Sequence, residues 1–542
     1  MPMSNVDFLL PLLVAVPMLL STVPIVLGLR FDRTGWSVAA LTTTALVAAT
    51  TALANAVYAT GPVSHKLGGW NPAYGIELVL DEFSALIAVL VAVTAAGVLA
   101  YTRVGGPRGN TFYSGYLLLT GGLLGISVTG DVFNLFVFLE IVGLATYAMI
   151  ASGDGPESAV AALKYLILGT VGASMYLIGV GLIFMATGTL NMGVLAEVLP
   201  AAVERDPTLV RAGFAFIFVG FSMKVAQWPL HTWQPDAYQH APDGVTPVIA
   251  AVVSTAYAYA FGRLLYSVFG PEFLTSTPYL TELVVTVGCV SVVAGSVLAV
   301  IQTDVKRMFA FSSVSQFGLI VAAYGLVTES AFVGATIHLV GHAVIKAGLF
   351  AAAGVIAISY DARTVDEYAG LADEHPLVAG MMALLLISLI GIPPSAGFVG
   401  KWYIALGAVE AQLWPVAIVV LFSTLMTLAY SARLLEKMYF TPATPLEAPH
   451  APESVATDGG EDGGDTETAA GADAANDGAA GTRGGTETAA LDAITANGDR
   501  NTVSYGMLAL VVAAALLAIS LGFAGGFLAG LLDPSFITEV FN

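Results

Sequence analysis

Three ionisable side chains recur at four-residue spacing in the apolar run 332–356: His338, His342 and Lys346. In a helix this spacing places them near one face, each about 6 Å further along the axis than the last. Ionisable groups are costly in hydrocarbon, so such a row normally faces a hydrated interior and marks an ion or proton path. Packed, hydrogen-bonded core histidines are the alternative, which is weakened because Lys346 completes the row.

An acid and two lysines lie inside other apolar runs. Glu140 is the tenth residue of the run 131–150, so we expect it near the middle of a bilayer, where an unpaired carboxylate binds a proton. Lys224, in the run 211–233, is expected to pair with an acid and exchange protons. We expect Lys164 to bridge Glu140 and Lys224. The alternatives are a purely structural Glu140–Lys224 pair and a Lys164 side chain that only reaches the membrane edge.

Two of the apolar runs contain helix breaks. Pro229 follows Lys224 by five residues, and Pro393 and Pro394 precede Lys401 in the segment GIPPSAGFVGK. Proline removes a helical hydrogen bond and clashes with the preceding turn, so each run should form two half-helices. Broken helices at matching positions of two repeats are the strongest sequence indication of a transport site. We therefore place Lys401 on the predicted path.

The composition requires a membrane for the elements that carry these residues. Of the 542 residues, 57% are hydrophobic and 11% charged, which is more apolar surface than a soluble protein of this size could bury. Apolar runs of about 20 residues predict an all-α polytopic membrane protein with about fourteen transmembrane helices. The two broken runs, 211–233 and 377–410, are the seventh and the twelfth.

The sequence contains no pattern typical of a bound cofactor or metal. Cys289 is the only cysteine, which excludes an internal disulfide, a thiolate metal cluster and iron–sulfur ligation on this chain. We find no phosphate-binding loop, no dinucleotide-binding glycine pattern and no nucleophile elbow in a loop context. We therefore expect no cofactor, no metal and no catalytic centre, and the energy must come from an ion gradient or a partner subunit.

Lysine and arginine are distributed unequally over the predicted connections. Loops after odd-numbered spans hold eleven of them and loops after even-numbered spans four, which predicts cytoplasmic odd loops and both termini outside. The segment 441–500 carries twelve acidic residues against two arginines and is predicted to be a disordered cytoplasmic loop. Such acidity is typical of a protein from a halophile, but an ordinary disordered loop explains it equally well.

Several charged or titratable residues near the ends of spans receive no role on the path. Lys306 and Arg307 are interpreted as anchors of the tenth span at the cytoplasmic surface. Four residues around the connection between the seventh and eighth spans are interpreted as solvated loop residues, with a role at an entrance to the path as the alternative: His231, Asp236, His240 and Asp243.

An internal repeat divides the chain. The pattern Asp131-Val132-x-x-x-Phe136-x-Phe138 recurs 173 positions later as Asp304-Val305-x-x-x-Phe309-x-Phe311. The offset corresponds to five spans, an odd number, and so predicts two inverted repeats, as in many secondary transporters. The predicted division is an N-terminal part with spans 1–3 (1–110), a first repeat with spans 4–8 (111–270), a second repeat with spans 9–13 (280–440), the acidic loop (441–500) and a C-terminal span 14 (501–542).

Five segments together resemble one superfamily. They are GDVFNLFVFLEIVGLATYAMI, MKVAQWPLHTWQPDAYQHAP, TDVKRMFAFSSVSQFGLI, HLVGHAVIKAGLF and GIPPSAGFVGKW. In these segments the chain is similar to the proton-translocating, antiporter-like subunits shared by respiratory complex I (NADH:quinone oxidoreductase), membrane-bound hydrogenases and Mrp-type multisubunit cation/proton antiporters. The resemblance covers roughly residues 75–440, and DVFNLFVFLE and FVGKW look most like the D-type subunit of the Mrp-type Na+/H+ antiporter.

This resemblance implies a fourteen-span fold with two inverted five-helix half-channels and with breaks in spans 7 and 12. By position, the family's functional residues correspond to an acid–lysine pair (Glu140 and Lys224), an auxiliary lysine (Lys164), a central row (His338, His342 and Lys346) and a terminal lysine (Lys401).

The chain departs from the family pattern in span 8. There the family usually carries a lysine or histidine that joins the two half-channels, whereas this chain has Thr255 at the usual lysine position and Ala250 at the usual histidine position. Tyr257 and Tyr259, together with water, are the remaining candidates for a relay across this span.

Three functions remain open at this point. The leading one is a proton-translocating, D-type subunit of a multisubunit Na+/H+ antiporter in the cell membrane, with other integral membrane subunits as partners and no nucleic acid. The second is a proton-pumping subunit of a complex I-like oxidoreductase or membrane hydrogenase. The third is a structural, weakly conducting assembly subunit, which the uncharged span 8 favours.

Overall fold

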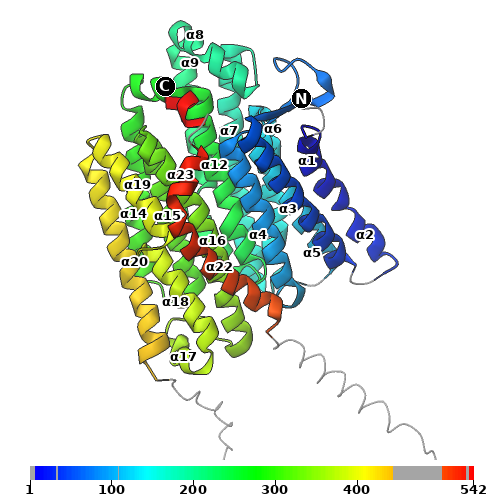
Figure 1. Ribbon diagram of the computed structural model, residues 1–542, viewed down its shortest axis with the longest axis vertical. Helices are drawn as coiled ribbons and strands as arrows, with labels where there is room; N and C mark the ends of the chain where they lie inside the picture. Colours follow the sequence, from blue (N-terminus) through cyan, green and yellow to red (C-terminus); the bar gives the residue numbers. More distant parts are fainter. Residues whose placement is uncertain (1–5, 32–33, 108, 443–502, 533–535, 542) are drawn as a thin grey trace, which may run out of the picture.

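The computed structural model describes residues 6–31, 34–107, 109–442, 503–532 and 536–541 as a bundle of long helices (Figure 1). Apart from its first two residues, the predicted acidic loop 441–500 lies outside the described residues. The described residues nearest to the two chain ends lie at one end of the bundle together with α8 (Met192–Arg205), and α17 (Leu371–Glu374) lies at the opposite end.

Twelve helical segments of the described residues are long and apolar enough to cross a membrane. They are α1 and α2 (Leu9–Leu20 and Val23–Gly28), α3 (Gly35–Thr60), α4 (Glu82–Gly105), α5 (Asn110–Val128), α6 (Val132–Ala151), α7 (Pro156–Thr187), the segment Thr246–Ser276, α14 (Leu280–Val300), α15 (Val305–Gly325), α16 (Glu329–Tyr360), α20 (Trp414–Phe440) and α22 (Tyr505–Phe523). A bent pair, Asp366–Glu374 with Pro376–Ile390, would be a thirteenth.

The two predicted spans that are missing from these twelve segments are the two that were expected to break. The seventh is divided into α9 (Pro207–Lys224) and α10 (Trp233–His240), and the twelfth into α18 (Pro376–Ile390) and α19 (Ala396–Glu410). Each half is shorter than a bilayer is thick, since a helix rises only 1.5 Å per residue. The breaks therefore account for the difference between twelve long segments and about fourteen predicted spans.

The centre of the bundle consists of three helical segments whose apolar stretches are buried along their whole length: Thr246–Ser276, α15 and α16. The first comprises α11 (Thr246–Val248), the π-helix η2 (Ile249–Val253), α12 (Ser254–Leu264), the π-helix η3 (Leu265–Phe269) and α13 (Gly270–Ser276). The outer helices α3, α7, α20 and α22 bury less than half of their apolar stretch. The predicted histidine–lysine row on α16 therefore lies inside the protein and not against lipid.

Short elements connect the helices at both ends of the bundle. The strands β1 (Val63–Lys66) and β2 (Glu77–Leu80) pair antiparallel, with Val63 opposite Leu80. The remaining short helices are η1 (Leu67–Gly69), η4 (Asp366–Tyr368), α23 (Gly525–Leu532) and α24 (Thr538–Phe541).

The helix starts of α6 and α15 are built in the same way. An isolated bridge joins Asp131 to Asn191, and a second bridge joins Asp304 to Thr364, so both partners are displaced by the same 173 positions. The flanking hydrogen bonds keep this register, at 2.9 Å each: the Val132 N–H donates to the Leu190 carbonyl, and the Val305 N–H donates to the Arg363 carbonyl. Asp131 and Asp304 also cap their helices. The repeat signal in the sequence thus corresponds to a repeated piece of structure, while the division into two five-span units stays a prediction.

Candidate proton-transfer site

The acid and the lysine predicted to form a pair lie together in the structure. Glu140 is on α6, Lys224 is the last residue of α9, and Lys224 Nζ lies 3.4 Å from Glu140 Oε1. The lysine side chain is 2% exposed and the carboxylate 24%. Removal of one member of such a pair would leave the other as an unpaired buried charge, so each group stabilises the other in the apolar interior.

The local sequence explains why Lys224 ends its helix. The backbone after it leaves the helical path: Ala226 has a φ of 55°, and Pro229 follows without an N–H to continue the ladder. The indole Nε1 of Trp233, at the start of α10, donates to the Met223 carbonyl at 2.8 Å. The two half-helices are therefore joined again directly beside the lysine.

The histidine–lysine row occupies the buried face of α16. His338 Nε2 lies 2.9 Å from Gln316 Oε1 on α15, and His342 packs edge to face on Phe317. Within the described residues neither ring nitrogen of His342 has a hydrogen-bond partner. Lys346 is fully buried. Its ammonium donates to the Phe309 carbonyl at 2.7 Å and to the Ser312 hydroxyl, both on α15.

Lys401 lies at the second helix break, as predicted. Its ammonium donates to the carbonyls of Leu389 and Ile390 at 3.3 and 3.0 Å, and these are the last two residues of α18. A helix end leaves such carbonyls without an intrahelical partner and carries a partial negative charge, which favours a cation there. Each broken helix thus places a buried lysine at the C-terminus of its first half, Lys224 as its last residue and Lys401 from the following half.

Lys164 does not lie where the sequence suggested. Its ammonium is 2.6 Å from Asp236 Oδ2 on α10 and does not bridge Glu140 and Lys224. The same carboxylate accepts a hydrogen bond from Arg307 Nη1 at 2.7 Å, so Asp236 joins α7 to α15. The expectation is wrong because it considered only acids inside the spans, and there Glu140 was the available partner. Asp236, the actual partner, lies near a connection and resembles a solvated loop residue in the sequence.

A second ion-pair cluster lies in the same region. Lys306 Nζ is 2.9 Å from Asp243 Oδ1, and Arg363 Nη2 is 3.5 Å from Asp243 Oδ2. Burial raises the pKa of Asp243, but the charges of Lys306 and Arg363 outweigh it and hold this pKa below its ordinary value. The carboxylate lines a cavity of about 650 Å³ together with His240 and Lys306.

These contacts correct the interpretation of Lys306 and Arg307 as simple membrane anchors and of Asp236 and Asp243 as solvated residues. A usable signal was in the sequence. The predicted orientation places the connection after span 7 and the connection after span 9 on the same side of the membrane. The first contains Asp236 and Asp243 and the second Lys306 and Arg307, so ion pairs between the two connections could have been expected.

A family model described as NADH:quinone oxidoreductase/Mrp antiporter, TM, matches residues 129–427. The chain belongs to this NADH:quinone oxidoreductase/Mrp antiporter family. The matched range contains every residue of the predicted path, from Glu140 to Lys401.

Relatives within the NADH:quinone oxidoreductase/Mrp antiporter family carry two kinds of name. The NADH-quinone oxidoreductase subunit N of Desulforudis audaxviator is 40% identical over 402 residues, which are 73% of this chain and 79% of that protein. The D-type Na(+)/H(+) antiporter subunit of Alkalihalophilus pseudofirmus is 32% identical over 381 residues, 69% of this chain and 76% of that protein. The sequence relatives therefore show an antiporter-like membrane subunit without deciding between the two kinds.

A solved structure is similar over the whole chain. A chain of the Mrp complex from a Dietzia species has a TM-score of 0.82 and 27% identity, and the match covers 100% of both chains. The helical fold and the superfamily expected from the sequence are thereby confirmed.

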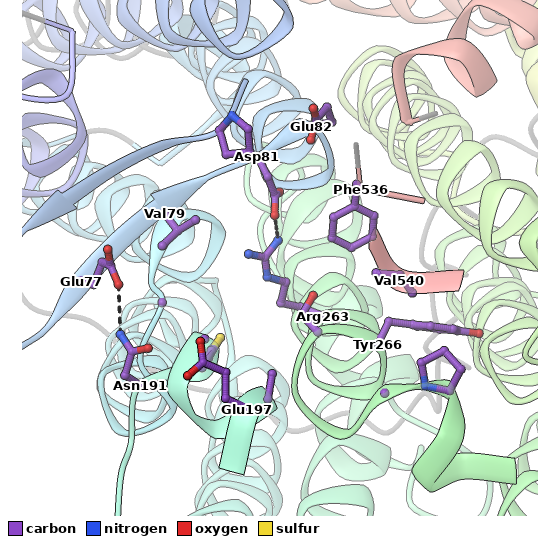
Figure 2. A pocket seen from close by; sticks show the side chains of 18 residues that line it. Glu77, Val79, Asp81, Glu82, Asn191, Glu197, Arg263, Tyr266, Phe536 and Val540 are labelled. Atoms are coloured by element: carbon purple, nitrogen blue, oxygen red, sulfur yellow. Dashed lines mark hydrogen bonds and ion pairs between the residues drawn. The ribbon is translucent and has the colours of Figure 1, made fainter. Parts of the chain in front are cut away.

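One further cavity, of about 550 Å³, lies at the end of the bundle that holds α8 (Figure 2). Arg263 pairs with Asp81, and Asn191 Nδ2 donates to Glu77 Oε2 at 3.2 Å. With Glu82 and Glu197, four acidic residues and one arginine line the cavity. A cleft lined mainly by one sign of charge concentrates ions of the other sign, so this surface attracts cations and protons. The described residues contain no group of three or more side chains suited to holding a metal ion.

Proposed function

We propose that this chain is the proton-translocating subunit of a multisubunit cation/proton antiporter and has the role of the D-type subunit. The observation that carries the proposal is the Glu140–Lys224 pair, in which a buried lysine at a broken helix contacts a carboxylate on a neighbouring span. An acid–base pair in a low dielectric can be loaded with a proton and emptied again when its separation changes.

The proposed path runs from the Glu140–Lys224 pair across the central segment Thr246–Ser276 to the α16 row and then to Lys401. The buried side chains of the row support it, because they line one face of a helix that lies wholly inside the protein. A membrane potential of 100 mV supplies about 2.3 kcal/mol per charge, comparable to a change of less than two pKa units in one group. Small changes in ion-pair geometry are therefore sufficient to move a proton along the path.

Two observations favour the antiporter as the complex to which the chain belongs. The match to a chain of the Mrp complex extends over all of both chains, and a relative named as a D-type Na(+)/H(+) antiporter subunit is 32% identical. We propose Na+ as the exchanged cation and the plasma membrane as the location, with both termini outside. The other membrane subunits of the complex would be its partners.

A second candidate is a proton-pumping subunit of a redox-driven complex. The 40% identity to a protein named NADH-quinone oxidoreductase subunit N favours it. In that case the Glu140–Lys224 pair would be driven by conformational changes in partner subunits and not by exchange against Na+.

The test uses inverted membrane vesicles that contain the complete native complex, with a pH-sensitive dye, comparing wild type with Lys224→Ala. The antiporter proposal predicts proton movement on addition of NaCl that is lost in the variant. Acidification driven by NADH or another reductant that is lost in the variant, with no response to NaCl, would assign the chain to the redox complex. If the variant changes neither response, the proton-path proposal is wrong and a structural role is left.

A further inference from the structure

The central segment has no charged side chain between the two halves of the path, but it carries a buried hydroxyl–amide cluster there. We propose that Gln234, Tyr238 and Ser254 form the proton relay between Lys224 and Lys346. This inference rests on the proposed function and names the residues that connect its two halves.

The cluster is a closed set of three hydrogen bonds between α10 and α12. Gln234 Nε2 donates to Tyr238 Oη at 3.1 Å and to Ser254 Oγ at 3.2 Å, and the two hydroxyl oxygens are 3.1 Å apart. Gln234 and Ser254 are fully buried and Tyr238 is 1% exposed. A hydroxyl both donates and accepts, so each can take up a proton on one side and release one on the other while its own composition is restored.

On one side, the cluster lies next to residues that contact the end of α9. Ser254 and Tyr257 are three residues apart on α12 and therefore share a helix face. The Tyr257 ring lies 5.4 Å from Lys224 Nζ. On α10 the Trp233 indole, next to Gln234 in the chain, bonds to the Met223 carbonyl beside the same lysine. Tyr257 and Trp233, which lie next to the cluster, thus contact the end of α9.

The other side of the cluster faces α16. The Tyr238 ring packs edge to face on Phe350, with the ring centres 5.6 Å apart. Lys346 Nζ lies 5.9 Å from the centre of the same Phe350 ring. The π-helix η2, just before Ser254, packs directly on α16. Phe350 therefore contacts both the cluster and the lysine that follows it on the path.

One polar atom of the cluster is suited to ordered water. Gln234 Oε1 is buried and has no partner among the described residues. Buried polar atoms normally find a partner, and where protein supplies none an internal water does. With such water, one proton leaves the Lys224 ammonium, each hydroxyl passes one on, and one proton arrives at the Lys346 amine.

Two hydroxyls of the same central segment serve as matched controls. Tyr259 is equally buried, but its hydroxyl donates to the Ser127 carbonyl at 2.9 Å, away from the cluster. The Thr255 hydroxyl donates to the Ala251 carbonyl, one turn earlier in η2, at 2.6 Å. The sequence suggested Tyr257 and Tyr259 as a relay. Of the two, Tyr257 contacts Lys224, whereas the hydroxyl of Tyr259 is bonded elsewhere.

The experiment measures the initial rate of proton movement per amount of assembled complex in the same inverted vesicles, driven by NaCl or by reductant, whichever drives the wild type. Tyr238→Phe and Ser254→Ala should each lower the rate at least tenfold, while Ser254→Thr, which keeps the hydroxyl, should restore most of it. Tyr259→Phe and Thr255→Val should stay near the wild-type rate.

The outcomes separate this inference from the proposed function. If Tyr238→Phe and Ser254→Ala transport normally while Lys224→Ala is inactive, the relay is wrong and the path stands. An equal loss in Tyr259→Phe, or a failure of Ser254→Thr to restore transport, would mean that packing and not the hydroxyl is needed, which also overturns the relay. Should Tyr238→Phe fail to assemble, the comparison of Ser254→Ala with Ser254→Thr decides.

Discussion

At the scale of single residues, the sequence identified the buried charges better than it identified their partners. Glu140, Lys224 and Lys346 were predictable because a charge inside a long apolar run is rare and costly, so its position alone is informative. Asp236 and Asp243 lie near connections, where charged residues are ordinary. Their pairing with Lys164, Arg307 and Lys306 depends on how distant helices pack, which hydropathy does not encode.

The Asp243 cluster allows a prediction about stability and pH. Asp243→Asn removes the charge that faces Lys306 and Arg363, and we expect a loss of about 1.5–3 kcal/mol near neutral pH, the usual range for hydrogen bonds to charged groups. Because the pKa of Asp243 is lowered in the folded state, its contribution is complete above the unfolded value of 3.8. It is lost as the pH falls through the lower folded value.

Thermal unfolding of the purified complex in detergent checks this prediction. The difference in Tm between wild type and Asp243→Asn should be constant from neutral pH down to about 5 and should shrink below the unfolded value of 3.8. Asp154→Asn is the control, since Asp154 is an exposed acid that lines the same cavity. A difference for Asp243→Asn that does not change with pH would contradict the assigned ion pairs.

At the scale of elements, the helix breaks were the most predictable feature of the site. Proline and glycine act on the local backbone, so Pro229 and the segment Gly391–Pro394 indicate broken helices without knowledge of the fold. It was harder to predict from the sequence which side chains bind the free backbone groups at the breaks. That Lys401 binds the free carbonyls of α18 follows from the angle at which α19 returns, and this angle is set by packing against α16.

Gly391 gives a test of the second break. It ends α18 with a φ of 89°, a conformation that costs an L residue about 1–2 kcal/mol. A Cβ there would also lie 3.3 Å from both the Gly397 carbonyl oxygen and Lys401 Cδ. Gly391→Ala should therefore lower the Tm of the complex and reduce the rate of proton movement, because Lys401 must shift from the helix end.

Gly380→Ala is the matched control for this substitution. Gly380 lies inside α18, and a Cβ there meets nothing within 4 Å. Alanine is favoured over glycine inside a helix by about 1 kcal/mol, so this variant should be as stable as wild type or more so and should transport normally. If Gly391→Ala behaves like Gly380→Ala in both measurements, the break does not depend on the glycine and does not hold Lys401 in place.

At the scale of the whole molecule, the long central helices explain why the sequence indicates buried polar residues in the interior, on which the proposed path rests. Thr246–Ser276, α15 and α16 have apolar residues on every face, which is the pattern of helices enclosed by other helices. A few polar and charged side chains are buried among these residues. The connection between the two halves was not predictable. It depends on the hydroxyl–amide cluster between α10 and α12, whose members are ordinary residues when considered singly in the sequence.

The orientation in the membrane is the last prediction, and it rests on the unequal distribution of lysine and arginine. In a Cys289→Ser background, which removes the only native cysteine, a single cysteine is placed at Glu197 on α8 or at Asp373 on α17. Both positions are exposed, and they lie at opposite ends of the bundle (Figure 1). A membrane-impermeant maleimide should label Glu197→Cys in intact cells and Asp373→Cys only after lysis. The reverse pattern would invert the orientation, placing the Asp236 and Asp243 clusters outside, and labelling of both from one side would contradict the arrangement of the bundle.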